Sequence, residues 1–392
     1  MAEEQTVCRW AALSLSTIAA IFLKDLVTPR SAPRLRHELV AISTTGSLDR
    51  ARTWLADNQI PNAENIKVYH SWEEMLRTEA VDVIYISTPH PLHYPMVKKA
   101  LENRRNVLVE KPATMNRSQY EVLSSLAKSQ NVVLMEAMWT RYQPLARYLK
   151  EELLPQIGDV RRVFSDFAFP IWSPEMPLSS RWLDKDAEAG CLLDQGVYAL
   201  TWVDMALNGL GADQRTSTKV VYSSTMSIPG VPNDVDDLNM IVISKQDKRS
   251  KKQEAFAVVT TGMTMPGSTK GDILNRLNAK KYAPTVRIEG TKALVAIPFP
   301  PIRAEKLEVQ WYDDSHLDED GKEKDELIER PLEGWGIWYQ AEEIGRLVHE
   351  RKTQHVETGV VIGGEETLRV LGWIDDARRQ AGIEYSPDLE AL

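Results

Sequence analysis

The first part of the chain alternates short apolar runs with helical segments, and this alternation constrains the fold more than any other feature. The clearest run is residues 81–87 (VDVIYIS), which is almost continuously apolar, as expected for a parallel strand covered on both faces. A helix is predicted after it at 91–103, and then a strand at 106–109. Parallel strands joined by helices of this length require right-handed crossovers, so the sequence predicts a doubly wound Rossmann sheet.

The pattern changes after about residue 155, where longer strands follow one another with few helices between them. The complete set of further expected elements is strands at 7–13, 38–43, 66–69, 160–169, 219–227, 238–244, 255–263 and 285–297, and helices at 17–26, 48–58, 337–351 and 367–381. The predicted fold class is therefore α/β. An N-terminal Rossmann domain (1–150) precedes an α+β domain (151–392) with a large, mostly antiparallel open sheet. We expect the helices within 337–381 to pack back on the first domain.

Composition narrows the functional classes. The 392 residues are 43% apolar with a net charge of −9, which fits a globular two-domain protein and argues against a nucleic-acid or anionic-membrane partner. Two cysteines exclude a disulfide framework and suit a reducing, cytoplasmic setting. The apolar run at 11–23 follows an acidic start and is too short to span a bilayer, so we expect a strand and a helix there. Charged stretches at 245–254 and 313–325 are either solvated hairpin loops or docking sites for a partner.

Several motifs occur in one order along the chain and together carry a family resemblance. They are Arg9-Trp10 with Lys24-Asp25-Leu26, residues 87–93 (STPHPLH), Glu110-Lys111-Pro112, residues 136–144 (EAMWTRYQP), residues 192–198 (LLDQGVY) and residues 286–292 (VRIEGTK). On these stretches the chain resembles the Gfo/Idh/MocA oxidoreductases, in particular their dimeric dihydrodiol dehydrogenase and NADP-dependent D-xylose dehydrogenase branch. The resemblance implies a small-molecule substrate and a homodimer formed through the C-terminal sheet.

The resemblance places Lys111 beside the nicotinamide and Tyr198 opposite it on the second domain. Oxidation of an alcohol needs a base that takes the hydroxyl proton while hydride leaves the carbon. A cationic Lys111 near Tyr198 would stabilise a phenolate, so both are candidate catalytic residues. Asp194 would orient the substrate or Tyr198, or cap a helix. Structural roles are the alternative, with Lys111 paired to Glu110 and Tyr198 packed in the core.

Aromatic and histidine side chains suggest further site residues. Candidates for the substrate pocket are Trp139, Arg141, Trp172 and Trp182, although core packing explains each tryptophan equally well. His90 and His93 are spaced as a metal pair, but no cysteine or carboxylate cluster accompanies them, and we expect no metal site. By resemblance this loop passes near the cofactor, which makes Thr88, Pro89 and His93 candidate cofactor contacts, together with Glu110.

The phosphate-binding turn departs from the family pattern. Ser14 and Ser16 occupy the first two glycine positions of the Rossmann fingerprint, and Ala19 keeps the small third position. A serine forced to positive φ costs about 1–2 kcal/mol, and losing one or two phosphate hydrogen bonds would weaken cofactor binding roughly tenfold to several thousandfold. Serine hydroxyls also donate to phosphates, and a helix N-terminus attracts anions. Cofactor binding by Ser14, Ser16, Thr17 and Ile18 is therefore in doubt but not excluded.

The second predicted strand ends in Ser43-Thr44-Thr45-Gly46-Ser47, with no acidic residue to hold a ribose 2′-hydroxyl. Thr44, Thr45 and the nearby Arg50 suit the 2′-phosphate of NADP better than NAD. The family's usual arginine directly after this strand is absent, so this preference is weak.

Two functional hypotheses remain open from the sequence. The first is an NADP-dependent dehydrogenase or reductase that acts on a sugar, a trans-dihydrodiol or another small alcohol or carbonyl compound. The second is a non-redox protein that kept the fold and lost the dinucleotide. It would be a cyclase, isomerase or lyase acting on a secondary metabolite, or a small-molecule-sensing regulator.

Overall fold

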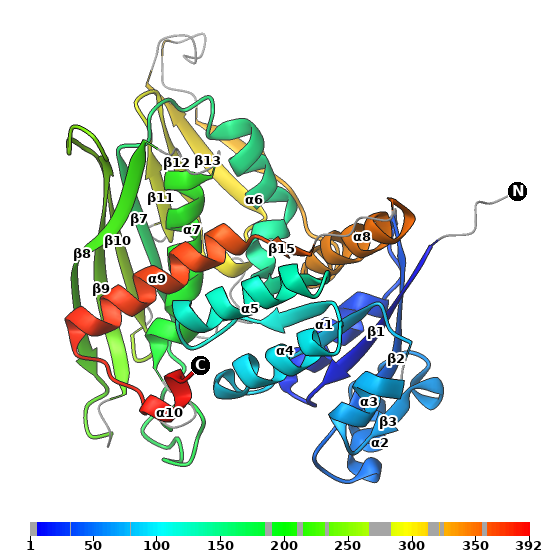
Figure 1. Cartoon of the computed structure of the whole chain (residues 1–392). Coiled ribbons are helices and arrows are strands. Elements are labelled where there is room, and N and C mark those ends of the chain that lie inside the picture. Colours follow the sequence, from blue (N-terminus) through cyan, green and yellow to red (C-terminus); the bar gives the residue numbers. More distant parts are fainter. Residues whose placement is uncertain are drawn as a thin grey trace, which may run out of the picture. The chain divides into compact units, whose positions relative to one another are not determined.

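The computed structural model describes residues 6–31, 33–78, 80–184, 190–209, 215–231, 235–265, 284–312, 321, 325–354 and 359–392 (Figure 1). The chain divides into two compact units. Unit 1 comprises Met1–Tyr142, Glu333–Leu368 and Glu390–Leu392, and unit 2 comprises Gln143–Leu332 and Arg369–Leu389. The predicted domain boundary at residue 150 stays a prediction.

Unit 1 contains a seven-stranded parallel sheet with the order β15-β6-β5-β4-β1-β2-β3. Its strands are β1 (Val7–Leu13), β2 (Arg36–Ser43), β3 (Lys67–Tyr69), β4 (Val83–Ile86), β5 (Val107–Glu110), β6 (Val133–Ala137) and β15 (Val360–Ile362). Its helices are α1 (Thr17–Val27), α2 (Leu48–Asp57), α3 (Trp72–Thr78), α4 (His93–Glu102), α5 (Arg117–Ser129), α8 (Trp338–Gln354) and the first residues of α9 (Gly364–Ala381). Strands β4 and β5 are buried at every position, which explains their continuous apolar sequence. The expected doubly wound sheet is confirmed.

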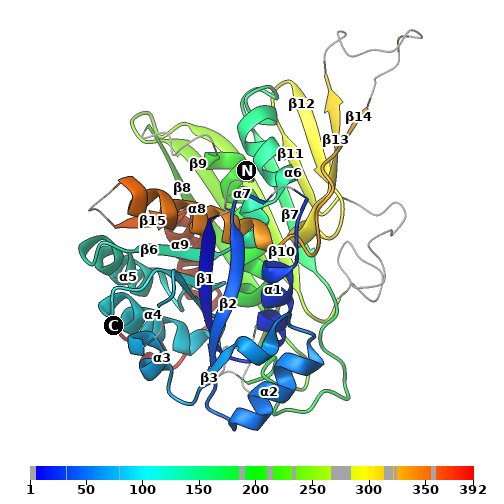
Figure 2. The ribbon, with the colours of Figure 1, turned by 90° about the vertical axis from the view of Figure 1, so that its right-hand side faces the viewer.

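The order of the parallel strands positions the functional site. Along the sheet, the chain runs from β1 outward to β3 on one side and from β4 outward to β6 on the other. Figure 2 shows β1 and β2 side by side. The topological switch therefore lies between β1 and β4, and ligands of such sheets bind outside the carboxyl ends of the strands at that point. The turns after β1, β2, β4 and β5 all emerge at this edge.

Helix α8 returns from late in the sequence and packs against β6 and α1 of the same unit. Buried Asp25 in α1 fixes its start, accepting the N–H of Trp335 on Oδ1 (3.0 Å) and that of Ile337 on Oδ2 (3.1 Å). The Arg30 guanidinium pairs with the same carboxylate at 2.5 Å. The Lys24-Asp25-Leu26 motif thus contributes a buried anchor for the start of α8.

Unit 2 contains an eight-stranded sheet with the order β14-β13-β12-β11-β7-β10-β9-β8. Its strands are β7 (Arg162–Ala168), β8 (Thr216–Ser227), β9 (Asp236–Asp247), β10 (Gln253–Gly262), β11 (Val286–Glu289), β12 (Ala293–Ile297), β13 (Lys306–Trp311) and β14 (Glu326–Glu329). All neighbours are antiparallel except β7 and β10. Its helices include α6 (Pro144–Tyr148), α7 (Val197–Asn208) and α10 (Pro387–Glu390), and α7 packs against β7 and β10. The expected large, mostly antiparallel sheet is confirmed.

The single strand expected at 285–297 is wrong, because this segment forms the hairpin β11–β12. A Cβ at Gly290 would lie 2.2 Å from the carbonyl oxygen of Ile157, so a glycine leaves room for this carbonyl beside the turn. The Gly290 N–H then donates to Ala293 O (2.9 Å). The charged stretch 245–254 lies around the β9–β10 turn, as its loop interpretation expected, whereas 313–325 lies largely outside the described residues.

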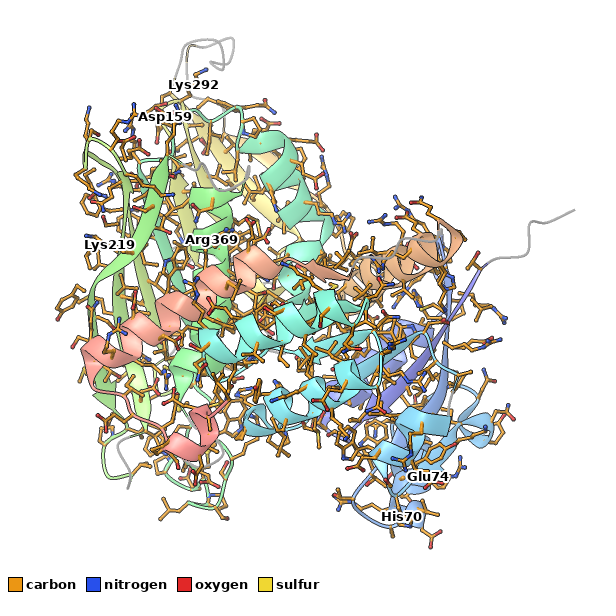
Figure 3. The ribbon with its side chains drawn as sticks, viewed as in Figure 1. His70, Glu74, Asp159, Lys219, Lys292 and Arg369 are labelled. Atoms are coloured by element: carbon orange, nitrogen blue, oxygen red, sulfur yellow. The ribbon has the colours of Figure 1, made fainter. Side chains whose placement is uncertain are left out.

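An ion pair between helices anchors α9 within unit 2. Arg369, labelled in Figure 3, contacts buried Asp204 of α7 through Nε–Oδ1 (2.7 Å) and Nη2–Oδ2 (3.1 Å). This bidentate geometry fixes the orientation of α9 relative to α7 as well as their contact.

Among the described residues, no helix is long and apolar enough to cross a membrane.

Candidate cofactor and catalytic site

The turn after β1 keeps the backbone shape of a glycine fingerprint although its glycines are replaced. Ser14 has φ +96°, on the side of the Ramachandran map that glycine adopts freely. Its N–H donates to Ser43 O (3.3 Å) at the end of β2. A serine therefore holds the conformation required at the first glycine position, and the strain of this conformation is already present in the free protein.

Ser16 has a different role, since it is the N-cap of α1 with ordinary extended backbone (φ −75°). Its Oγ accepts the Ala19 N–H (3.1 Å) and lies 3.1 Å from Oγ of Ser87, just after β4. The hydroxyl thereby links the start of α1 to the end of β4. Thr17 and Ile18 form the first turn of the helix, whose N-terminus favours an anion.

These two serines should respond oppositely to substitution. Ser16→Ala is expected to lower the free energy of unfolding by about 1 kcal/mol, because the cap is lost. Ser14→Gly is expected to be neutral or stabilising, since relief of about 1–2 kcal/mol of strain offsets a glycine entropy cost of about 0.5–1 kcal/mol. Urea unfolding measures both, with Ser47→Ala at the cap of α2 as the matched control for Ser16. A larger loss for Ser14→Gly than for Ser16→Ala would contradict the positive φ at Ser14.

The turn after β2 brings an arginine over a small residue. The Thr44 side chain accepts the Gly46 N–H (3.0 Å), and Ser47 caps α2 by accepting the Arg50 N–H (3.1 Å). A Cβ on Gly46 would lie 3.4 Å from Arg50 Cδ and 3.7 Å from Nη1, so the Arg50 side chain lies over this turn. Arg50 and Thr45 are exposed. The turn therefore presents hydroxyls and a guanidinium to an anion at the carboxyl end of β2.

The loop after β4 is tied to the turn after β5 by a buried histidine. His93 places Nε2 2.8 Å from Thr88 O and Nδ1 2.9 Å from Pro112 O. Burial lowers the pKa of His93 to about 4, although the two carbonyls oppose that shift. Pro89 is exposed, and the Thr88 hydroxyl oxygen is buried with no hydrogen-bond partner among the described residues. Both His93 nitrogens face carbonyls, so the ring is a poor metal ligand, and its direct contact with a cofactor stays a prediction.

The lowered pKa of His93 predicts a pH dependence of stability. A histidine whose pKa falls from 6.5 to about 4 on folding is neutral in the native state and protonates first in the unfolded state. The stability that it contributes is lost as the pH falls from about 6.5 towards 4, with a slope of at most about 1.4 kcal/mol per pH unit. Urea unfolding between pH 7 and pH 4 should therefore be less pH-dependent in His93→Gln. An unchanged profile would mean that His93 does not titrate in this range.

Buried carboxylates hold both sides of the Glu110-Lys111-Pro112 turn. Glu110 Oε1 accepts the Tyr85 hydroxyl (2.7 Å), and its Oε2 accepts the Lys111 N–H (3.3 Å). The Lys111–Pro112 peptide is cis. The following Ala113 N–H donates to Glu136 Oε1 (3.1 Å). This framework presents the partly exposed Lys111 at the carboxyl end of β5.

Arg141, expected in the substrate pocket, instead binds Glu136, the carboxylate that accepts the Ala113 N–H of this turn. Its Nη1 lies 3.1 Å from Glu136 Oε2 and donates to Thr367 Oγ1 (3.0 Å), which in turn donates to Glu136 (2.7 Å). Trp139 beside it is 5% exposed. Glu136, although part of the 136–144 motif, and Thr367 were not predicted as site residues, because only the fold brings them together. A direct role of Trp139 or Arg141 in substrate binding stays a prediction.

The remaining predicted residues belong to unit 2. Tyr198 lies in the first turn of α7, buried and edge-to-face with Phe167 (centroids 5.6 Å apart), and Asp194 precedes it, partly buried. Trp172 packs on a small apolar cluster, and the Arg181 guanidinium covers Trp182 at 3.7 Å. Lys111 and Tyr198 belong to different units, so their cooperation stays a prediction.

Part of unit 1 matches a known protein family. Residues 21–138 match the model of an oxidoreductase family with an NAD-binding Rossmann fold, GFO_IDH_MocA. The chain contains a Gfo/Idh/MocA oxidoreductase domain. The resemblance noted in the sequence is thus confirmed.

Relatives of this chain align over nearly its whole length. D-xylose 1-dehydrogenase (NADP(+)) of Hypocrea jecorina is 29% identical, with coverage of 97% of this chain and 93% of the relative. Trans-1,2-dihydrobenzene-1,2-diol dehydrogenase of Xenopus tropicalis is 27% identical over 96% and 99%. A crystal structure of a 3-ketoreductase from Actinomadura kijaniata with NADP and TDP-benzene has the same fold, with a TM-score of 0.70 at 20% identity over 96% and 98%. These relatives do not favour the non-redox hypothesis.

Proposed function

We propose that this chain is an NADP-dependent dehydrogenase or reductase that interconverts an alcohol and a carbonyl group on a sugar, a trans-dihydrodiol or a similar small molecule. The observation that carries the proposal is the Lys111 turn. It is held by Glu110 and Glu136 at the same sheet edge as the Ser14–Ser16 and Thr44–Ser47 turns. Relatives aligned over nearly the full length carry the names of such enzymes.

The residues at this edge fit NADP. The turn at Ser14 keeps a positive φ, the N-terminus of α1 offers an anion site, and the buried Thr88 hydroxyl oxygen is without a partner among the described residues. Ser14, Ser16, Thr17 and Ile18 would hold the pyrophosphate. Thr44, Thr45 and Arg50 would hold the 2′-phosphate, and Thr88, Pro89, His93 and Glu110 would flank the nicotinamide end. When bound, NADP accepts or supplies the hydride.

The chain's own residues would manage the proton. In the oxidative direction the Tyr198 phenolate, stabilised by the Lys111 ammonium, would take the hydroxyl proton of the substrate and pass it to solvent. An alcohol and NADP⁺ thus give a carbonyl, NADPH and H⁺. Asp194, four residues before Tyr198 on the same segment, would orient the substrate or the tyrosine. In the reductive direction the same groups return the proton.

Titration with cofactor tests the proposal directly. We expect saturable enhancement of NADPH fluorescence, followed by turnover of D-xylose, a trans-dihydrodiol or another polyol when NADP is supplied. No NADPH binding at millimolar concentration would refute a dehydrogenase function. Binding without turnover of any alcohol or carbonyl compound would favour the non-redox hypothesis.

We further propose a homodimer through the open face of the unit 2 sheet, in the cytoplasm. Strand register places Tyr222, Val242 and Val258 side by side on one face, with Met240 and Phe256 two residues along their strands. Tyr222, Met240 and Phe256 are 48%, 42% and 46% exposed, which is unusual for apolar side chains on adjacent strands. Light scattering should give twice the chain mass, and Phe256→Glu should give the monomer.

Both cysteines are free and buried, which suits a reducing compartment.

A further inference from the structure

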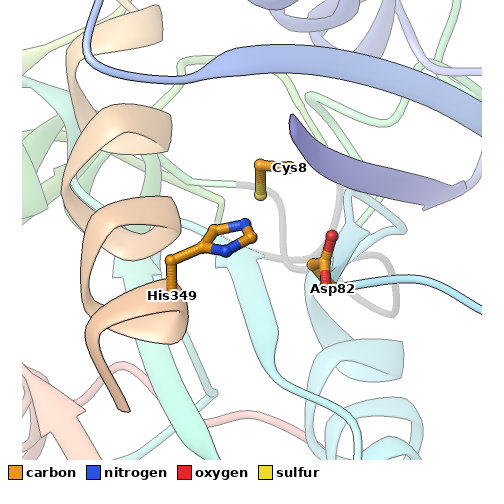
Figure 4. A group of neighbouring side chains, drawn as sticks. All are labelled: Cys8, Asp82 and His349. Atoms are coloured by element: carbon orange, nitrogen blue, oxygen red, sulfur yellow. The ribbon is translucent and has the colours of Figure 1, made fainter. Parts of the chain in front are cut away.

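Three potential metal ligands meet in unit 1 although they are far apart in sequence. Figure 4 shows Cys8 of β1, Asp82 just before β4 and His349 of α8 pointing toward a common centre. One ligand atom of each lies within 4.8 Å of the others. This cluster lies at the amino ends of β1 and β4, whereas the proposed cofactor site is at their carboxyl ends.

The histidine is oriented like a ligand. Its Nε2 is buried and has no hydrogen-bond partner among the described residues. The Val7 backbone carbonyl accepts a hydrogen bond from the ring. Because Nε2 has no partner in the described part of the chain, Nδ1 is the nitrogen that donates it. Metal-binding histidines commonly donate one ring N–H to a backbone carbonyl, which fixes the tautomer and leaves the other nitrogen for the metal. His349 has this arrangement, with Nδ1 hydrogen-bonded to the backbone and Nε2 left for a metal.

The thiol and the carboxylate complete a mixed donor set. Cys8 is fully buried, and α8 packs close to it, since a Cβ on Gly345 would lie 3.4 Å from Cys8 Sγ. Burial raises the pKa of the Cys8 thiol, so without a metal the sulfur carries its proton. Asp82 is fixed by the Arg9 N–H, which donates to Oδ2 (2.8 Å), and the Lys352 ammonium pairs with Oδ1.

We propose that Cys8, Asp82 and His349 bind a divalent metal of the zinc type, with Lys352 as the cation that pairs with the carboxylate when the metal is absent. Sulfur, imidazole nitrogen and a single carboxylate are the donors that zinc prefers, whereas magnesium and calcium prefer oxygen alone. Bonds of about 2.0–2.3 Å place tetrahedral ligand atoms about 3.3–3.6 Å apart. The ligand atoms lie within 4.8 Å of one another, so a contraction of at most about 1.5 Å closes the site. Water would supply the fourth ligand.

The charges balance in both states. Without metal, the neutral thiol, the Asp82 carboxylate and the Lys352 ammonium sum to zero. On binding, the Cys8 thiol releases its proton to solvent, and the thiolate and carboxylate neutralise the dication. The Lys352 side chain, 56% exposed, then turns into solvent. The metal would clip α8 to β1 and to the segment before β4.

Cobalt(II) absorption tests the site with a readout independent of enzyme activity. We expect the whole chain, freed of metal with a chelator, to develop a thiolate-to-cobalt charge-transfer band and visible d–d bands, and added zinc to abolish both. Cys8→Ser should lose the charge-transfer band, and His349→Gln should bind roughly tenfold more weakly or worse. Cys191→Ser is the matched control for the chain's other buried cysteine and should keep the band.

Lys352→Met gives the sharpest arm, because it removes the competing cation without touching a ligand. Zinc affinity, measured by competition with a chromophoric chelator, should rise in this variant. The proposal is overturned if no thiolate band forms, if the band survives Cys8→Ser, or if Lys352→Met leaves the affinity unchanged. Circular dichroism of each variant checks that it folds, and a folded Cys8→Ser variant that binds cobalt as tightly as the unchanged chain also overturns it.

Discussion

Replacement of Lys111 by methionine is expected to lower kcat by about 10²–10⁴-fold, the range of a positioned proton-transfer group. Methionine keeps the length and apolar stem of lysine and removes the ammonium group that we propose acts with Tyr198 in proton transfer. The turn itself should survive, because Glu110 and Glu136 bind its backbone N–H groups. NADPH binding should therefore persist while turnover is lost. Stopped-flow reduction of the cofactor with saturating substrate measures the effect.

Two further variants define the result. Lys99→Met on α4 is the matched control, since Lys99 is an exposed lysine of the same unit and should leave kcat unchanged. Tyr198→Phe should reproduce the loss if both residues handle one proton, and the double variant should then be little worse than either single variant. A Lys111→Met enzyme with normal kcat would remove Lys111 from the chemistry and leave only its structural role.

Much of the unit 1 fold could be predicted because each parallel strand is buried on both faces and therefore gives an apolar run. The prediction fails where the pattern is short or depends on contacts. Strand β15 has three residues, and its pairing with β6 comes from the fold, not from local sequence. The hairpin at Gly290 was missed because the reason for its glycine is the carbonyl of Ile157, far away in sequence.

The candidate site also has one feature that the sequence predicts and one that depends on contacts in the fold. The positive φ of Ser14 followed from its place in the glycine fingerprint, whereas the second serine could be understood only in three dimensions. Ser16 caps α1 and contacts Ser87, so this substitution adds a local hydrogen bond to the turn. At the first glycine position Ser14 keeps the positive φ that glycine would adopt, and at the second position Ser16 caps a helix. The doubt about cofactor binding therefore concerns side-chain crowding near the phosphates, not the path of the backbone.

Arg50→Ala is expected to weaken NADPH binding roughly 10–100-fold while NADH binding changes little. A hydrogen bond from a guanidinium to a phosphate contributes about 1.5–3 kcal/mol, and only NADPH carries the 2′-phosphate. The Arg50 side chain lies over Gly46 in the turn that follows β2, and no carboxylate stands in residues 43–48 to bind a free ribose hydroxyl instead. Fluorescence titrations with the two reduced cofactors give the ratio of dissociation constants directly.

Arg52→Ala is the matched control, because Arg52 is an exposed arginine on the same helix whose Nη1 donates to Ala63 O (2.9 Å), away from the turn. It carries the same charge as Arg50, so a general electrostatic effect would weaken NADPH binding equally in both variants. A direct phosphate contact predicts that Arg50→Ala weakens NADPH binding selectively. It also predicts that added salt weakens NADPH binding to the unchanged chain. If NADPH and NADH weaken together, Arg50 stabilises the turn after β2 and another group selects the cofactor.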